Sequence, residues 1–290
     1  MLVVALVAGR YLWPATSADA SHDGAPSWSP DSQQIAFSVE AHGQTDIYVM
    51  RADGTGRRAL TSTVSQDGAP AFSPDGRSIA FESDRDGNPE IYVMDASGAN
   101  VRRLTNSVAD DRAPAWSPDG RRLAFLSDRD EAVQADVFTM NAADGSDVRR
   151  VTTDGQHWAP QYAPTGTSLA VQRAHDLYLV DAAGGAARRL TFDPKNGMSP
   201  TWAPDGQRLA FTSTRNERLE LFMMNVDGGD QELLVQMSGA SVMDPRWSPD
   251  GRRIAFVYVP NQDGALARTD QPYGISVVEL ATRKITRLSP

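Results

Sequence analysis

Short apolar runs separated by turn-forming residues fill the chain from about residue 21 to its end. The stretch between residues 70 and 105 shows the pattern most clearly, with apolar runs near 70–72, 79–81, 91–94 and 101–105. Runs of this kind, bounded by Gly, Pro, Asp and Ser, predict β-strands. The second and third runs are apolar at consecutive positions, which is typical of strands covered on both faces. Each unit therefore predicts a four-stranded sheet that packs against a neighbour on either side.

One seven-residue phrase occurs six times: Pro, any residue, an aromatic residue, Ser or Ala, Pro and, in most copies, Asp-Gly. The copies recur at intervals of 40 to 46 residues and begin at Pro26, Pro70, Pro114, Pro160, Pro200 and Pro245. Repeats of this length that each form four strands are typical of β-propellers. The sequence therefore predicts an all-β fold, a six-bladed β-propeller of four-stranded antiparallel blades.

Two features inside the repeat agree with this fold. Residues 73–76 read Ser-Pro-Asp-Gly, which suits a type I turn between the first and second strands of a blade. The centre of the second strand is alanine in every copy, at Ala36, Ala80, Ala124, Ala170, Ala210 and Ala255. A small residue at this place indicates close contact between neighbouring sheets, because protein interiors are tightly packed.

The sequence divides into a leader, residues 1–20, and a propeller, residues 21–290. The leader combines an apolar run at 2–8 with a small-residue pattern at 18–20. We interpret it as the remnant of a secretory signal or of a membrane anchor, with a leader of no functional consequence as the alternative. The first two readings place the propeller in the periplasm or otherwise outside the cytoplasm. The last strand, at 284–288, completes the sixth blade, so ring closure is predicted to rest on packing between blades one and six.

Composition narrows the range of partners. The formal net charge is −9, and paired arginines recur in the fourth strand, at 57–58, 102–103, 149–150 and 188–189. Charges at the outer edge of each sheet prevent association between sheets, and their scatter around a rim suits no nucleic-acid groove. The chain has no cysteine, which excludes disulfides and thiol catalysis. We expect a monomer that binds no nucleic acid and whose propeller does not insert into a membrane.

Several phrases carry a resemblance to a known family. Residues 116–125 (WSPDGRRLAF), residues 83–94 (SDRDGNPEIYVM) and residues 102–105 (RRLT) resemble the β-propeller repeats of TolB-like proteins. The resemblance extends over all six repeats. It implies a cell-envelope propeller that binds a protein partner, with an envelope lipoprotein as one candidate. The α/β domain that precedes the propeller in TolB is not recognisable here, so the resemblance concerns the propeller alone.

The loops that lead from one blade to the next place a residue near the ring axis, three positions before each opening proline. These residues are Asp23, Asp67, Asp111, His157, Gly197 and Val242. Loops between the second and third strands reach the same face and carry Arg85, Arg129, Arg173 and Arg215. Carboxylates and a histidine on one arc could bind a partner or a cation, or could cap backbone amides and pair with these arginines. We predict partner binding, without metal, through Asp23, Asp67, Asp111, His157, Arg85, Arg129 and Arg215.

The loop between the second and third strands is longest in the sixth blade, at 260–274. Long loops in compact domains are usually functional or disordered. Together with an insertion at 130–136, this loop breaks the sixfold symmetry of one face. We expect Arg268 and Tyr273, which lie in the long loop, to contact a protein partner.

The sequence offers no recognisable catalytic motif. It contains neither a G-x-S-x-G elbow nor an H-E-x-x-H helix nor a phosphate loop, and its four histidines show no triad spacing. The sequence therefore predicts a non-enzymatic protein-interaction scaffold without a cofactor. Two alternatives stay open: a calcium-dependent propeller hydrolase or lyase with its site in the central channel, and the detached propeller domain of a peptidase or membrane sensor.

Overall fold

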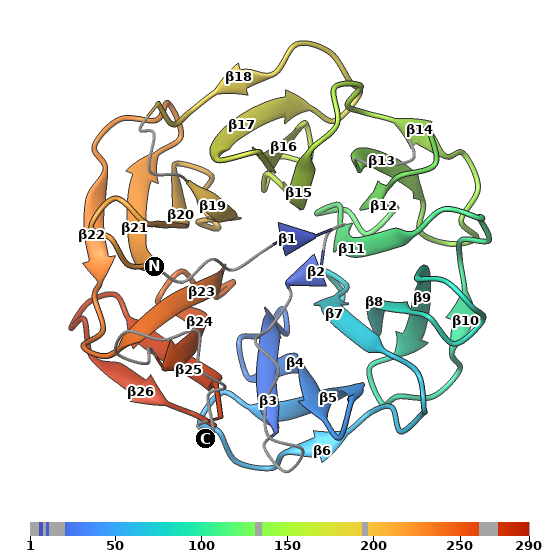
Figure 1. The fold of residues 1–290 in the computed structure, drawn as a ribbon, viewed down its shortest axis with the longest axis horizontal. Helices are drawn as coiled ribbons and strands as arrows, with labels where there is room; N and C mark the ends of the chain where they lie inside the picture. Colours follow the sequence, from blue (N-terminus) through green and yellow to red (C-terminus); the bar gives the residue numbers. More distant parts are fainter. Residues whose placement is uncertain are drawn as a thin grey trace.

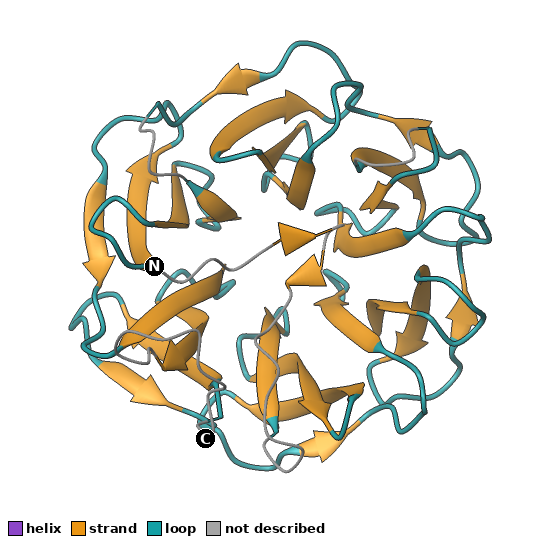
Figure 2. Ribbon diagram, in the orientation of Figure 1, coloured by secondary structure: helices purple, strands orange, loops and turns teal. Residues whose placement is uncertain are grey.

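A computed structural model shows six four-stranded antiparallel sheets arranged around a common axis (Figure 1). The structure describes residues 21–130, 135–192, 197–260 and 272–289, and two short strands near the N-terminus. These strands, β1 (Leu6–Val7) and β2 (Arg10–Tyr11), pair with each other and are drawn over the centre of the ring. Strands and loops make up the whole of the described chain (Figure 2). The predicted six-bladed β-propeller is confirmed.

Each blade consists of four strands that are consecutive in the sequence and adjacent in the sheet. The first blade comprises β3 (His22–Trp28), β4 (Gln34–Ala41), β5 (Gln44–Arg51) and β6 (Arg58–Ala59). The second comprises β7 (Asp67–Phe72), β8 (Ser78–Ser83), β9 (Glu90–Asp95) and β10 (Arg102–Arg103). The third comprises β11 (Asp111–Trp116), β12 (Arg122–Ser127), β13 (Asp136–Asn141) and β14 (Arg149–Arg150). The fourth comprises β15 (His157–Tyr162), β16 (Ser168–Arg173), β17 (Asp176–Asp181) and β18 (Arg188–Arg189). The fifth comprises β19 (Met198–Trp202), β20 (Arg208–Ser213), β21 (Glu220–Asn225) and β22 (Glu232–Val235). The sixth comprises β23 (Ala240–Trp247), β24 (Arg253–Pro260), β25 (Gly274–Glu279) and β26 (Ile285–Arg287).

The Ser-Pro-Asp-Gly segment forms the turn between the first and second strands. In the second blade the amide of Gly76 donates to the carbonyl of Ser73 at 2.9 Å, and Gly76 has a φ of +71° that favours glycine. The hydroxyl of Ser73 donates to Asp75 at 2.6 Å and accepts from the amide of Ser78 at 3.0 Å. This network closes the hairpin with the residues that the phrase supplies in most copies.

The hydrophobic core lies between the blades. Each apolar cluster combines side chains from two neighbouring sheets, and the alanine at the centre of every second strand is completely buried against the next blade. Ala80, for example, packs with Phe125 and Phe138 of the third blade. The strands are therefore covered on both faces, as their apolar runs predicted.

Replacing Ala80 with leucine is expected to lower the free energy of unfolding by about 1–3 kcal/mol, because added methylenes force apart a packed interior. Urea denaturation monitored by tryptophan fluorescence measures the change. The exposed Ala99 in the same blade provides the control, since Ala99→Leu alters no packed contact. Equal stability of the two variants would contradict close contact between blades at this position.

The paired arginines of the fourth strands bind two different groups. In the second and fourth blades the first arginine reaches the next blade: Arg102 donates to the carbonyl of Ala143 at 2.8 Å, and Arg188 donates to the carbonyl of Val226 at 3.0 Å. The second pairs within its blade, as Arg103 does with Glu90 at 2.7 Å. These arginines therefore join neighbouring blades at the outside of the ring, in addition to placing charge on the outer strands.

Ring closure joins the first and sixth blades through side chains. The sixth sheet contains only β23, β24, β25 and β26. The indole nitrogen of Trp28 donates to the carbonyl of Arg246 at 3.0 Å, and the guanidinium of Arg253 lies 4.7 Å from the indole ring of Trp28. Apolar side chains from both blades complete the contact. Among the described residues, closure therefore rests on packing between blades one and six, as predicted.

Every innermost strand contains the same irregularity. The residue before the opening proline adopts a left-handed conformation in all six blades, with φ between 46° and 51°, at Ala25, Ala69, Ala113, Ala159, Ser199 and Asp244. The pairing register of the inner strand shifts around this point in every blade. Such a bulge re-aims the side chains that follow it. Here the residue between the proline and the aromatic lines a cavity on the ring axis.

Candidate functional site

One face of the ring collects the connections between blades and the loops between second and third strands. We call it the loop face; it includes the connections β6–β7, β10–β11, β14–β15, β18–β19 and β22–β23. The opposite face, formed by the Ser-Pro-Asp-Gly turns, is the turn face. This division follows from the antiparallel order of each sheet. The predicted axial residues stand at or near the start of the innermost strands, on the loop face.

The second blade shows how its axial carboxylate is held. Asp67 is completely buried, and Nη2 of Arg85 donates to both of its oxygens at 3.0 and 2.9 Å. Nε of Arg85 donates to the hydroxyl of Ser83 at 2.9 Å, and that hydroxyl in turn donates to Asp67. The central carbon of the guanidinium also lies 5.4 Å from the ring centroid of Phe81 and 5.0 Å from that of Tyr92. Asp67 is thus paired with an arginine that rests on an aromatic pair.

The third blade repeats this arrangement. Nη2 of Arg129 donates to the two oxygens of the buried Asp111 at 2.9 and 2.8 Å, and Nε donates to Ser127 at 2.8 Å. Burial raises the pKa of Asp111, although Ser127 and Arg129 oppose the increase. The ion pair therefore offsets only part of the cost of burying the carboxylate.

The first blade reaches the same result by another route. Its second and third strands are joined by two residues only, which leaves no loop to carry an arginine. Arg57, just before the fourth strand, instead donates to both oxygens of Asp23 at 2.7 and 2.9 Å. Its guanidinium lies 5.2 Å from both Phe37 and Tyr48. Burial raises the pKa of Asp23 despite this charge.

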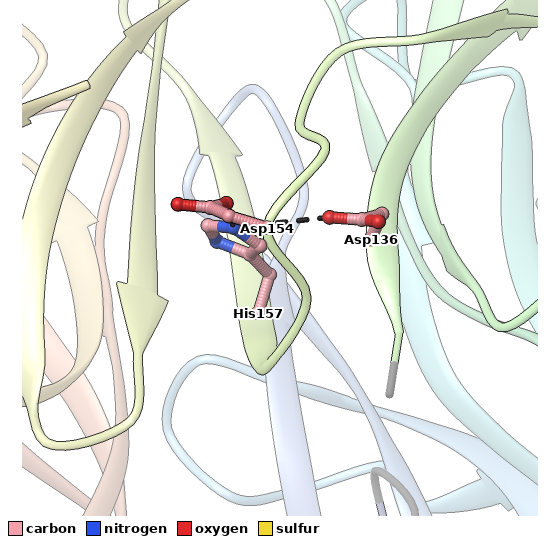
Figure 3. A group of neighbouring side chains, drawn as sticks. All are labelled: Asp136, Asp154 and His157. Atoms are coloured by element: carbon pink, nitrogen blue, oxygen red, sulfur yellow. Dashed lines mark hydrogen bonds and ion pairs between the residues drawn. The ribbon is translucent and has the colours of Figure 1, made fainter. Parts of the chain in front are cut away.

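The fourth blade departs from the pattern because a histidine replaces the aspartate. Nε2 of the buried His157 lies 2.6 Å from Asp154 and 3.9 Å from Asp136, and the ligand atoms of the three residues lie within 4.8 Å of one another. Figure 3 shows the imidazole of His157 beside Asp154, with Asp136 across a short gap. Burial lowers the pKa of His157, outweighing the two carboxylates.

One histidine and two carboxylates form a ligand set that suits a cation. Both oxygens of Asp136 already accept hydrogen bonds, one from Arg150 and the other from Thr152 and from the amide of Gly155. Asp154 is paired with Arg173 at 2.6 Å. A cation would compete with two guanidinium groups for these oxygens. The cluster therefore fits an ion-pair network better than a metal site.

We expect the unfolding free energy of the protein to fall as the pH is lowered from about 8 to about 6, in part because of His157. Its folded pKa lies below the ordinary value of 6.5, so protonation favours the unfolded chain. Stability that is present above pH 6.5 is lost as the pH falls through this value towards the folded pKa.

Chemical denaturation of wild type and His157→Gln at both pH values measures this contribution. The pH-dependent loss should be smaller in His157→Gln, in which glutamine keeps a polar group beside Asp154. His22 is unchanged in both proteins, and burial lowers its pKa too, so some loss remains. An identical pH dependence in the two proteins would contradict the assignment to His157.

Of the other predicted site residues, Arg215 lies where it was expected and Tyr273 does not. Arg215 occupies the expected loop and lies 4.4 Å from the ring of Phe222, but the axial residue of its blade is Gly197, which has no carboxylate to pair with it. Tyr273 differs from the expectation: it is only 1% exposed and stacks on His22 at a centroid distance of 3.9 Å. Tyr273 follows the long loop and enters the core, so its ring is not at the surface. Arg268 lies outside the described residues.

Two surface features were not predicted from the sequence. Three apolar side chains in the connections of the loop face are strongly exposed: Val64 at 88%, Val108 at 103% and Phe192 at 72%. On the turn face, the axis contains a cavity of about 470 Å³ lined by all six repeat phrases. The exposure of residues 64, 108 and 192 depends on the loop conformation, which the repeat pattern does not reveal.

The six four-stranded blades define a β-propeller, and in its first three blades a buried axial aspartate is paired with an arginine. A model of the TolB beta propeller domain matches residues 14–105, 86–176 and 154–288, so the chain belongs to this family. No helix in the described part of the chain is long and apolar enough to cross a membrane.

Individual relatives are similar either over a short part of the chain or over most of it at low sequence identity. The Tol-Pal system protein TolB of Thioalkalivibrio sulfidiphilus is 34% identical over 63 residues, which are 22% of this chain and 14% of that protein. The crystal structure of TolB from Acinetobacter baumannii superposes with a TM-score of 0.70 at 19% identity, over 92% of this chain and 63% of that one. The crystal structure of an oligogalacturonate lyase from Vibrio parahaemolyticus superposes with a TM-score of 0.63 at 14% identity. The match covers 94% of this chain and 79% of that one. At these identities the two structures support the fold alone.

Proposed function

We propose that this propeller is a non-enzymatic scaffold that binds a protein partner through its loop face. The observation that carries the proposal is the exposure of Val64, Val108 and Phe192, which stand in three different connections of that face. All three stand on the same face of the ring, where a protein partner would cover them. By contrast, the next most exposed large apolar residues among the described ones, such as Val148 at 41%, lie beside outer strands.

Arginines on the same face give the proposed surface its polar part. The side chains of Arg57, Arg85 and Arg129 are 30%, 23% and 24% exposed, whereas their aspartates are almost completely buried. A partner would touch the edges of the guanidinium groups, and Asp23, Asp67 and Asp111 would hold these groups in position. Arginine beside apolar residues is typical of interface centres. His157 would likewise support Arg173 through Asp154, and Arg268 remains a proposed contact in the long loop.

The proposed setting is the cell envelope, because relatives in this family are named for the Tol-Pal system. The partner is a protein, for which an envelope lipoprotein is a candidate, and the propeller is proposed to act as a monomer. The likeness to an oligogalacturonate lyase supports the fold, but the carboxylates of Asp154 and Asp136 beside His157 are paired with arginines. No specific observation therefore favours a lyase over a binding scaffold.

The triple variant Val64→Glu, Val108→Glu, Phe192→Glu tests the proposal. It places charge in three exposed side chains, so the fold should be retained while an apolar interface is lost. Immobilised wild type and variant are compared for proteins captured from envelope extract, identified by mass spectrometry.

The matched control is Val101→Glu, Val148→Glu, which charges two exposed valines next to the outer strands. The account predicts one or a few proteins captured by wild type and control but not by the triple variant. Equal capture by all three proteins would contradict a partner site on the loop face. Melting temperatures of the variants show whether each remains folded.

A further inference from the structure

A cavity on the ring axis opens from the turn face and shares no lining residue with the loop face. It has a volume of about 470 Å³, within the range of small-molecule pockets. Its wall is built from the six repeat phrases, whose aromatic residues are Trp28, Phe72, Trp116, Tyr162, Trp202 and Trp247. The six prolines of the turns complete the wall.

The residue between the opening proline and the aromatic differs from blade to blade, although the rest of the wall is repeated. Every one of these residues lines the cavity: Ser27, Ala71, Ala115, Gln161, Thr201 and Arg246. Blades two and three contribute alanines, whereas blades four, five and six contribute an amide, a hydroxyl and a guanidinium and blade one a second hydroxyl. The cavity is therefore asymmetric, with its polar groups on one side.

Two of the polar side chains are used within the protein. The hydroxyl of Ser27 accepts from the amide of Phe72 at 3.1 Å, and the hydroxyl of Thr201 accepts from the amide of Trp247 at 3.2 Å. These hydroxyls join neighbouring blades. Among the described residues, the side-chain amide of Gln161 forms no hydrogen bond within the protein, which leaves it available to a ligand.

Arg246 is the one charged side chain in the described wall of the cavity. Its guanidinium donates to the carbonyl of Pro245 at 2.9 Å and has no carboxylate within ion-pair distance among the described residues. This contrasts with Arg57, Arg85 and Arg129, each of which is paired with an aspartate. Arg246 therefore brings a positive charge to an aromatic-walled cavity without a carboxylate of the described chain to neutralise it.

We propose that this cavity binds a small organic carboxylate. Arg246 binds the carboxylate, Gln161 donates a second hydrogen bond to it, and the rings of Trp116, Tyr162 and Trp202 contact the apolar part of the ligand. Arginine suits this task because its planar donors match a carboxylate. The site is distinct from the proposed partner surface, since it opens on the opposite face.

The test is a titration of the full-length protein with benzoate and with benzamide, followed by tryptophan fluorescence. The two probes have the same shape, but only benzoate is charged. Benzoate is expected to give a saturable change and to bind about ten-fold more tightly than benzamide, as one charge-assisted contact would give. In Arg246→Gln the ratio of the two affinities should fall to about one, while Gln161→Leu should reduce it partially.

Arg252→Gln is the matched control, because Arg252 is exposed in the neighbouring turn and does not line the cavity. The control should keep the wild-type preference, and melting temperatures show that each variant is folded. A short peptide with a free C-terminal phenylalanine, compared with its carboxamide, distinguishes a chain terminus from a small molecule as the source of the carboxylate. The proposal is overturned if benzoate produces no saturable change, if benzamide binds equally well, or if the preference survives in Arg246→Gln.

Discussion

Replacing Arg129 with methionine is expected to lower the free energy of unfolding by about 3–5 kcal/mol at neutral pH, because it leaves a buried charge without a partner. Nη2 of Arg129 donates to both oxygens of Asp111, which is completely buried. Methionine preserves much of the contact with Phe125 and Phe138, so the measured loss reports mainly on the charge. Urea denaturation at pH 7 gives the difference in unfolding free energy.

The pH dependence of this loss separates charge from packing. Burial already raises the pKa of Asp111, and removing Arg129 should raise it further. The variant should therefore lose less stability relative to wild type at a pH near 5 than at pH 7, because Asp111 becomes protonated. The double variant Asp111→Asn, Arg129→Met should recover part of the loss. A loss that is independent of pH and unchanged in the double variant would show that the ion pair is not its cause.

Replacing Trp28 with alanine is expected to cost about 3–5 kcal/mol, the range for large aromatic residues removed from a core. Trp28 is 6% exposed, and its indole joins the first blade to the carbonyl of Arg246 in the sixth. If closure relies on packing between these blades, the seam should be as sensitive as any other contact between blades. Thermal and urea unfolding measure the loss.

The matched variant is Trp116→Ala, at the same position of the third blade, which lies away from the junction of the chain ends. The indole of Trp116 donates to the carbonyl of Ala71 at 2.9 Å. The two substitutions should destabilise the protein by comparable amounts. A cost below about 1 kcal/mol for Trp28→Ala, beside a large cost for Trp116→Ala, would mean that the ring is not closed through Trp28.

Much of the fold was predictable because the same local chemistry recurs in each repeat. The Ser-Pro-Asp-Gly phrase specifies a turn wherever it stands, and an alanine such as Ala80 indicates a close contact whichever blade faces it. The pairing of Asp67 with Arg85 was one of the alternatives open from the sequence. Both residues recur at fixed distances from the phrase, so their neighbourhood follows from the blade itself.

Other parts of the site depend on details that periodicity does not reveal. Arg57 substitutes for a loop arginine because the hairpin of its blade is too short, and its pairing with Asp23 crosses the width of the sheet. Tyr273 was assigned to an exposed loop, yet it stacks on His22 of the first blade. Such contacts join residues about 250 positions apart, at 22 and 273, and only the closed ring brings them together. The left-handed residue before each proline was equally hidden, because four of the six are alanines, which give no sign of this conformation.

The most direct test of the central claim is site-specific photo-crosslinking, with benzoylphenylalanine introduced singly at Val64, Val108, Val101 and Val148 and irradiated in envelope extract. We expect one discrete protein adduct, shared by the probes at Val64 and Val108 on the loop face and absent from those at Val101 and Val148 beside the outer strands. An adduct formed equally from the outer positions, or formed only from them, would contradict a partner-binding loop face.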